Sequence, residues 1–305
     1  MSAITQAFPP PKFGFAGHET FPFRYGWLKK AISGSRLYPG LFNQDQAIVT
    51  LGVGKNMVQS IHHWGLATGM LNEVARGEVQ PSMWGKKLLE EWDPHLEDLA
   101  SLWLIHYFLI THPEKAACWH LAFFRWSRPE FNRAELTDFL TELAERQSLK
   151  ARRATLERDV DCFIRTYLPA RGKAKEVMEE SFDCPLVELG LLRRLKDEER
   201  YQFVVGPKPT LPSEIVGFAL LRFLDTARQN RQTVAFQDCL YAPSSPGQAF
   251  KLDENTLMEH MEEIQLLCGG AVELDDTAGL KQVYIRGELD PGALLNRYYE
   301  ERIRG

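Results

Sequence analysis

Two glycines followed by an amphipathic segment constrain the fold of this chain more than any other feature. Gly52 and Gly54 break the backbone just before residues 55–67. Apolar residues recur there at helical spacing: Met57, Val58, Ile61 and Trp64. The polar side chains of the same segment are Lys55, Asn56, Gln59, His62 and His63. This pattern is typical of the second helix of a helix-turn-helix, whose apolar face packs on its domain while its polar face enters a DNA groove.

The segments around this helix predict a winged helix-turn-helix. A first helix is expected from Pro22 to Gly34, and a short second helix through Ile48 and Leu51 after a cap at Asn43 or Asp45. Residues 70–87 then favour a strand, a Gly/Pro turn and a return strand. We therefore predict a winged-helix-like DNA-binding unit over residues 14–95, preceded by a flexible arm at residues 1–13 that contains three consecutive prolines.

The middle of the chain predicts a helical domain over residues 96–207. Residues 96–126 are the most apolar, and Pro113 divides them into two helices. His106, His112 and His120 are interpreted as core or surface histidines with satisfied hydrogen bonds. Residues 135–147 and 148–168 predict a second helix-turn-helix-like pair, followed by a strand at YQFVV.

The last third predicts another winged-helix-like unit over residues 208–305. Helices are expected at 211–227, in VAFQDCLYA, and in a run capped by Asp253. Residues 271–285 predict a β-hairpin with its turn at DDTAG. The predicted fold class is mainly α with small β-wings, built from multiple helix-turn-helix or winged-helix-like units.

Charge is distributed unevenly along a chain whose formal net charge is −5. Residues 1–89 hold nine Lys/Arg against four Asp/Glu, and residues 146–175 hold nine against three. Residues 250–305 hold six against twelve. This segregation fits a basic surface for an anion in the first half, and an acidic end that either docks a protein partner or keeps the chain soluble. Simple solvated faces are the alternative.

Composition also bounds the compartment and the cofactors. There is no run of roughly 18 apolar residues and no signal peptide, so a cytoplasmic protein is expected. The five cysteines are scattered, which favours structural thiols over disulfides or zinc. GVGKN at residues 52–56 lacks the first glycine and the Ser/Thr of a phosphate loop, so no nucleotide cofactor is expected.

Candidate DNA contacts fall into two groups. Groove contacts are predicted for Lys55, Asn56, Gln59, His62 and His63. Phosphate contacts are predicted for Arg24, Lys29, Lys30, Arg152 and Arg153. Around residues 152–165 the interspersed acids leave a solvated helix face with local ion pairs as an equal alternative.

His18 and Glu19 in the GHET sequence are the candidate catalytic residues, because they form an unusual polar pair near the predicted DNA-binding helix. A nuclease uses carboxylates to position metal-bound water, so Mg²⁺ or Mn²⁺ would be the cofactor, with metal ligands unknown. The alternative is a hydrogen bond at the entry of the first helix. No known nuclease signature is visible.

The segments 15–30, FAGHETFPFRYGWLKK, and 47–69, AIVTLGVGKNMVQSIHHWGLATG, resemble the opening of a bacterial defence-associated family of formerly unknown function. Segments 93–106 and 155–167 are also similar to that family. The resemblance implies DNA binding and a nick in one strand within a DNA phosphorothioation system. It also implies work beside a cysteine desulfurase, a sulfurtransferase-like enzyme and an ATPase. It provides no catalytic motif.

We therefore predict a DNA-binding protein of a phosphorothioation or anti-phage defence system that nicks one strand to allow sulfur incorporation. The alternatives are a non-catalytic DNA-binding adaptor that recruits the sulfur-transfer enzymes or a separate nuclease, and a transcriptional regulator. A structural scaffold is the remaining possibility.

Overall fold

The computed structural model describes residues 12–169, 184–195, 199–227, 233–277, 279–287 and 289–304. These residues form two compact units, an N-terminal unit up to Phe203 and a C-terminal unit from Val204 onward. The predicted arm at residues 1–13 lies almost entirely outside the described residues. The predicted domain boundaries are finer than this division and stay a prediction.

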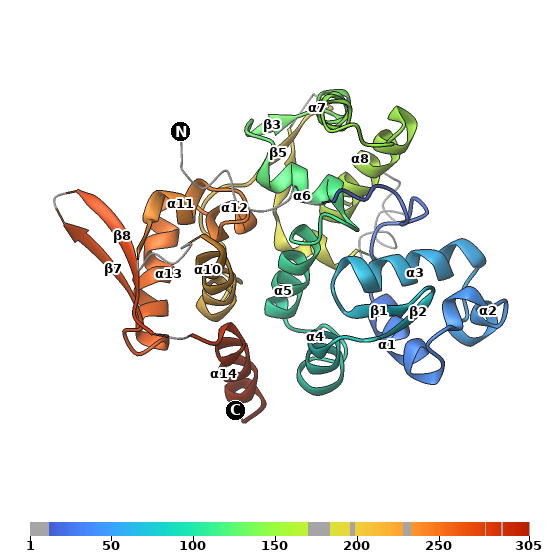
Figure 1. The fold of residues 1–305 in the computed structure, drawn as a ribbon, viewed down its shortest axis with the longest axis horizontal. Helices are drawn as coiled ribbons and strands as arrows, with labels where there is room; N and C mark the ends of the chain where they lie inside the picture. Colours follow the sequence, from blue (N-terminus) through green and yellow to red (C-terminus); the bar gives the residue numbers. More distant parts are fainter. Residues whose placement is uncertain are drawn as a thin grey trace. The chain divides into compact units, whose positions relative to one another are not determined.

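The N-terminal unit begins with a group of helices and a hairpin (Figure 1). In chain order these are α1 (Trp27–Leu37), η2 (Leu41–Asn43), α2 (Gln46–Leu51), α3 (Lys55–Ala67), β1 (Leu71–Ala75) and β2 (Glu78–Pro81). Gly52 ends α2 in the left-handed region at φ 64°, and Gly54 in extended conformation precedes α3. The helix predicted from Lys55 and the antiparallel hairpin predicted within residues 70–87 are confirmed.

The first helix differs from the prediction. Pro22 lies outside any helix, and α1 begins only after Gly26, whose φ of 74° lies in the left-handed region. Gly34 lies inside α1 rather than ending it. A Cβ at Gly34 would come within 2.9 Å of Leu41 and 3.2 Å of Leu51, so this glycine permits close packing instead of terminating the helix.

The most apolar segment forms the core of this unit. Its elements are α4 (Met83–Lys86), the π-helix η3 (Lys87–Trp92), α5 (Leu99–Ile110) and α6 (Ala117–Phe124). The Asp98 carboxylate caps α5 by accepting a hydrogen bond from the Ala100 amide at 2.9 Å. Because α5 is apolar all round, every residue from Ala100 to Ile110 is buried.

The three histidines of this segment have hydrogen-bond partners, as predicted. The Nδ1 atom of His106 lies 2.8 Å from the Tyr167 hydroxyl. Nδ1 of His112 lies 2.7 Å from the Phe108 carbonyl oxygen, and Nδ1 of His120 lies 2.8 Å from that of Ile110.

A second helical pair and a small sheet complete the unit. They comprise β3 (Glu130–Phe131), α7 (Arg133–Arg146), α8 (Arg153–Tyr167), η4 (Pro185–Leu189), β4 (Leu192–Arg194) and β5 (Tyr201–Phe203). Asn132 and Glu135 form a capping box that sets the start of α7, with both hydrogen bonds at 2.9 Å. The strands pair antiparallel in the order β3-β5-β4, which confirms the strand predicted at YQFVV.

The C-terminal unit consists of helices beside a three-stranded antiparallel sheet (Figure 1). Its elements are α10 (Ser213–Ala227), β6 (Thr233–Ala235), α11 (Phe236–Tyr241), α12 (Pro246–Phe250), α13 (Glu254–Leu267), β7 (Val272–Thr277), β8 (Leu280–Ile285) and α14 (Pro291–Arg304). Asp253 caps α13 and the β7–β8 hairpin forms as predicted. The additional strand β6 joins the hairpin through β8, where the sequence predicted only a helix.

Together these elements confirm the predicted fold class, mainly α with small antiparallel β-sheets. Among the described residues, no helix is both long and apolar enough to cross a membrane.

Candidate functional site

Residues 14–21, here called the anchored loop, have the most unusual backbone in the N-terminal unit. Ala16, Gly17, Glu19 and Thr20 all adopt positive φ, at 67°, 97°, 48° and 64°. Only glycine adopts this region at no cost, so the three other residues store backbone strain. Strain of this kind persists only where surrounding contacts hold it, and it often marks functional loops.

The start of the loop is fixed against the turn between α5 and α6. The Gly14 amide donates to the Pro113 carbonyl oxygen at 2.9 Å, and the Ala117 amide donates to the Gly14 carbonyl oxygen at 3.0 Å. A Cβ at Gly14 would lie only 1.9 Å from the backbone oxygen of Glu114. Glycine is therefore required where these two backbones meet.

A buried pair, His18 and Asp159, holds the middle of the loop to α8. The Thr20 amide donates to Nδ1 of His18 at 3.1 Å, so Nδ1 is the acceptor and Nε2 carries a proton. That Nε2–H lies 2.9 Å from Oδ1 of Asp159. The Ala16 amide reaches both carboxylate oxygens of Asp159 at 3.1 Å. His18 is only 2% exposed, and both its ring nitrogens are engaged in holding the loop.

Helix α3 supports the loop from another side. The Ser60 hydroxyl donates to the His18 carbonyl oxygen at 3.0 Å, and the Trp64 indole donates to that of Phe21 at 3.2 Å. His63 is buried beside Gly17, where a Cβ would lie 2.5 Å from Nδ1 of His63. The loop is therefore shaped by side chains from α3 and α8, more than 40 and 140 residues away in sequence.

Burial keeps two histidines of this unit neutral. Desolvation, with smaller contributions from His18, His62 and Lys115, lowers the pKa of His63 to about 3. Desolvation likewise lowers the pKa of His120 to about 4, against an opposing hydrogen bond to Ile110. Unfolded histidine titrates near 6.5, so below that pH the unfolded state binds more protons than the folded state.

This difference predicts acid sensitivity. The stability contributed by neutral His63 is complete above pH 6.5 and is lost as the pH falls from there toward 3. At pH 5 the expected loss is about 2 kcal/mol for each buried histidine. Chemical unfolding at pH 7.5 and pH 5, followed by circular dichroism, measures it. His63→Gln should reduce the difference between the two pH values, whereas His95→Gln, at an exposed histidine, should not.

Exposed polar residues of α3 and α8 flank the loop. Lys55, Asn56 and Gln59 are exposed on α3, and Asn56 lies one turn before Ser60. Arg158 is exposed on α8, one turn before Cys162, whose thiol donates to the Phe21 carbonyl oxygen at 3.3 Å. Both helices therefore contact the anchored loop and carry exposed polar residues one turn before a contact, Asn56 on α3 and Arg158 on α8.

Two of the predicted groove residues are placed differently. His63 does not lie on the exposed face, and that predicted position is wrong because Ser60, His63 and Trp64 form the side of α3 that packs on the loop. His62 is half-buried and stacks on Phe42, with ring centroids 4.9 Å apart, and desolvation lowers its pKa.

The predicted phosphate contacts mostly have partners within the protein. The ammonium of Lys29 donates to the Leu89 carbonyl oxygen at 2.8 Å, and that of Lys30 to the Leu51 oxygen at 2.7 Å. Arg24 lies over the rings of Phe21 and Trp27. These three residues stabilise the packing around α1.

At the start of α8, Arg153 pairs with Asp138 at 2.7 Å and with Glu157 at 3.2 Å. Arg152, its exposed neighbour, precedes the helix. The local ion pairs expected from the sequence are thus present at Arg153, while Arg152 and Arg158 point to solvent.

The two predicted catalytic residues differ in exposure, since Glu19 is exposed while His18 is buried. Sequence inspection missed Asp159, Ser60 and Arg165 as partners of their loop. The sequence does contain a signal for Asp159. This acidic residue lies beside the apolar positions of an amphipathic helix, so its charge falls on the buried face.

Among residues that the structure describes, no group of three or more His, Cys, Asp or Glu is placed to hold a metal ion. All five cysteines are free thiols, and burial raises the pKa of Cys118 and Cys162, which fits a structural role.

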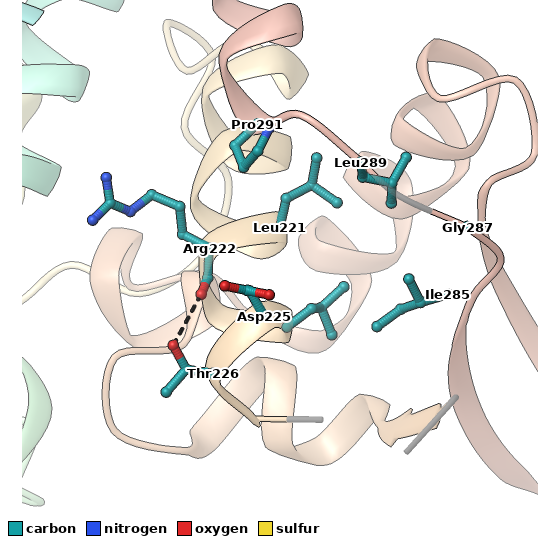
Figure 2. Close-up of a pocket in the computed structure, with 9 residues that line it drawn as sticks. Leu221, Arg222, Asp225, Thr226, Ile285, Gly287, Leu289 and Pro291 are labelled. Atoms are coloured by element: carbon teal, nitrogen blue, oxygen red, sulfur yellow. Dashed lines mark hydrogen bonds between the residues drawn. The ribbon is translucent and has the colours of Figure 1, made fainter. Parts of the chain in front are cut away.

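A pocket of about 360 Å³ lies in the C-terminal unit, between α10 and the segment joining β8 to α14 (Figure 2). Leu221, Ile285 and Leu289 surround it, and Arg222 extends away from these side chains. The Thr226 hydroxyl donates to the Arg222 carbonyl oxygen at 3.3 Å. This lining mixes apolar side chains with Arg222, Asp225 and Thr226, and its backbone lacks the strain of the anchored loop, which is therefore the better candidate site.

Comparison with known proteins places this chain in a family. A crystal structure of magnesium ion-bound SspB superposes with a TM-score of 0.84 at 28% sequence identity, covering 98% of this chain and 91% of that one. A second SspB crystal structure gives a TM-score of 0.83 with the same identity and coverage. No curated protein sequence matches the chain. The family model described as "Protein of unknown function (DUF4007)" matches residues 15–299. The resemblance seen in the sequence is therefore confirmed, and the chain belongs to the DUF4007 family, with a fold similar to that of SspB.

Proposed function

We propose that this protein binds DNA and nicks one strand in a bacterial DNA phosphorothioation system that defends against phage. The main supporting observation is the anchored loop, which exposes Glu19 and is held by α3 and α8, the helices that carry the exposed residues Lys55, Asn56, Gln59 and Arg158. The likeness to SspB over almost the whole chain supports a role in a DNA phosphorothioation system.

The DNA surface of this proposal comprises residues exposed around the loop. Lys55 and Arg158 supply positive charge for phosphates, while Asn56 and Gln59 have amides that suit the edges of bases. Arg152 extends the basic face at the start of α8. Lys29, Lys30 and Arg24 have partners within the protein, so in this proposal they support the packing beneath the DNA surface.

The cutting step is assigned to the loop itself. Glu19 is its exposed carboxylate, and the loop backbone sets the direction of that side chain. Magnesium commonly takes one or two protein carboxylates, with substrate phosphates and waters as its other ligands. Glu19 fits the part of such a carboxylate. His18, engaged on both ring nitrogens, positions the loop.

The proposal also includes the system's other proteins. A cysteine desulfurase, a sulfurtransferase-like enzyme and an ATPase would supply and insert the sulfur at the nicked strand, in the cytoplasm. The acidic residues of 250–305 are the surface to examine for such partners.

Incubation of pure protein with supercoiled plasmid and Mg²⁺ or Mn²⁺ tests the function directly. Open circles that form with metal and disappear with EDTA support a nickase. Clear gel-shift binding without open circles would instead make the protein a DNA-binding adaptor. If neither nicking nor binding occurs at low salt, the proposal is wrong.

The DNA surface makes a separate prediction. Lys55→Ala with Gln59→Ala should weaken DNA binding and lower the salt slope of the binding constant by about 1, because one phosphate contact is lost. Fluorescence anisotropy over a salt series measures both effects. Lys86→Ala, at an exposed lysine of α4, is the matched control. Equal effects of the two variants would exclude this face of α3.

A further inference from the structure

A second site lies next to the anchored loop. A pocket of about 270 Å³ in the N-terminal unit is lined by residues that include Arg133, Arg165, Arg194, Glu199, Tyr201 and Leu168. We call it the arginine pocket. Three guanidinium groups contribute to one small cavity, and a cavity lined by charges of one sign attracts ions of the opposite sign.

The sheet positions two of these arginines. Tyr201 of β5 is the central residue of a cross-strand row, paired with Phe131 on β3 and Arg194 on β4. Tyr201 is only 1% exposed and is one of the residues that line the pocket. The guanidinium carbon of Arg194 lies 5.8 Å from the ring centroid, and that of Arg133 lies 5.6 Å away. These cation–π contacts hold the two side chains beside the cavity.

Arg165 links this pocket to the candidate site. One of its terminal nitrogens donates to the carbonyl oxygen of Thr20, in the anchored loop. Its Nε lies 3.4 Å from the Asp161 carbonyl oxygen, one turn back on α8. A ligand in the arginine pocket would therefore lie beside the residue that contacts the strained loop.

The charge in the pocket is only partly compensated. Arg133 pairs with Asp161 at 2.6 Å and lies 4.0 Å from Glu199. Among the residues that the structure describes, Asp161 and Glu199 offset two of the three guanidinium charges, so one net positive charge remains at the cavity. Guanidinium groups bind phosphate oxygens through paired, charge-assisted hydrogen bonds, so the side chains that line the pocket fit a phosphate group.

We propose that the arginine pocket binds a backbone or terminal phosphate of the DNA strand that lies over the anchored loop. The proposal rests on the proposed DNA function for its ligand. Whether Arg165 and Arg194 hold a phosphate can be tested separately from that function.

Arg194→Gln is the variant of choice, because it removes one guanidinium while Tyr201 and the strand remain. Arg193→Gln is the matched control, since Arg193 is the next residue of β4, exposed, and bonded to Gln202 at 2.6 Å. Affinity is measured by anisotropy for a labelled duplex with an internal nick bearing a 5′-phosphate, and by calorimetry for inorganic phosphate. We expect Arg194→Gln to weaken duplex binding by about tenfold at low salt and the control to leave it unchanged.

The outcomes separate the two proposals. If the protein binds DNA and the two variants behave alike, the arginine pocket is not a phosphate site. If the wild-type protein does not bind DNA, the proposed function is wrong. The phosphate titration then decides whether the arginine pocket binds an anion. Phosphate binding that is lost only in Arg194→Gln then supports an anion pocket for free phosphate. Absent or equal phosphate binding overturns the pocket as well.

Discussion

Replacing Asp159 with alanine is expected to lower the free energy of unfolding by about 3 kcal/mol, because a buried acceptor of two hydrogen bonds is lost. Asp159 is 1% exposed, and its carboxylate faces Nε2 of His18 and the Ala16 amide. Alanine would leave the His18 N–H buried without its acceptor. Denaturant unfolding followed by tryptophan fluorescence measures the change.

The matched control is Glu157→Ala, two residues earlier on α8. Glu157 is exposed and pairs with Arg153 at 3.2 Å. A pair of that kind contributes about 0.3–0.5 kcal/mol. Asp159→Asn, which keeps one side-chain oxygen as acceptor, should fall between the two. Equal stability of the Asp159→Ala and Glu157→Ala variants would mean that the buried pair does not hold the loop.

Hydrogen exchange distinguishes a local effect from a global one. The Ala16 and Thr20 amides depend directly on Asp159 and His18. In Asp159→Asn they should exchange faster under native conditions than amides of α5, which lies in the core. Uniform acceleration would instead indicate that the whole unit has been destabilised.

Local signals in the sequence were enough to predict α3, the hairpins and the cap of α13. Each depends on neighbours within a few residues, such as Gly54 before α3 or Asp253 bonded to the Thr256 amide. The start of α1 was mispredicted because a glycine such as Gly26 can adopt either a helical or a left-handed conformation. Only tertiary packing determines which of the two it adopts. The strand β6 was missed because its pairing partner β8 lies some fifty residues later.

The candidate site could be predicted only in part, because its geometry depends on contacts between distant segments. The GHET sequence looked unusual by itself, but its partner Asp159 is 141 residues from His18. His63 is buried because of the way α3 is rotated about its axis against the loop. Helical periodicity alone does not determine that rotation. The arginine pocket is similar, since its residues come from α7, α8 and two strands that become neighbours only in the fold.

Replacing Glu19 with glutamine is expected to reduce plasmid nicking by about 10²–10⁴-fold, because a metal ion contributes several kcal/mol of transition-state stabilisation and about 1.4 kcal/mol is tenfold in rate. The change removes the negative charge and keeps the size of the side chain, so the strained conformation at φ 48° should be retained. Because Glu19 is exposed, the free energy of unfolding and the affinity for DNA should stay near wild-type values.

The control Glu97→Gln changes another exposed carboxylate of the same unit and should leave nicking intact. Normal nicking by Glu19→Gln would show that the cut is made elsewhere. If Asp159→Asn instead abolished nicking while Glu19→Gln did not, the loop backbone rather than its carboxylate would be the functional element. We expect both variants to lose nicking activity and to retain DNA binding. That result is required if the loop cuts DNA and the buried His–Asp pair positions it.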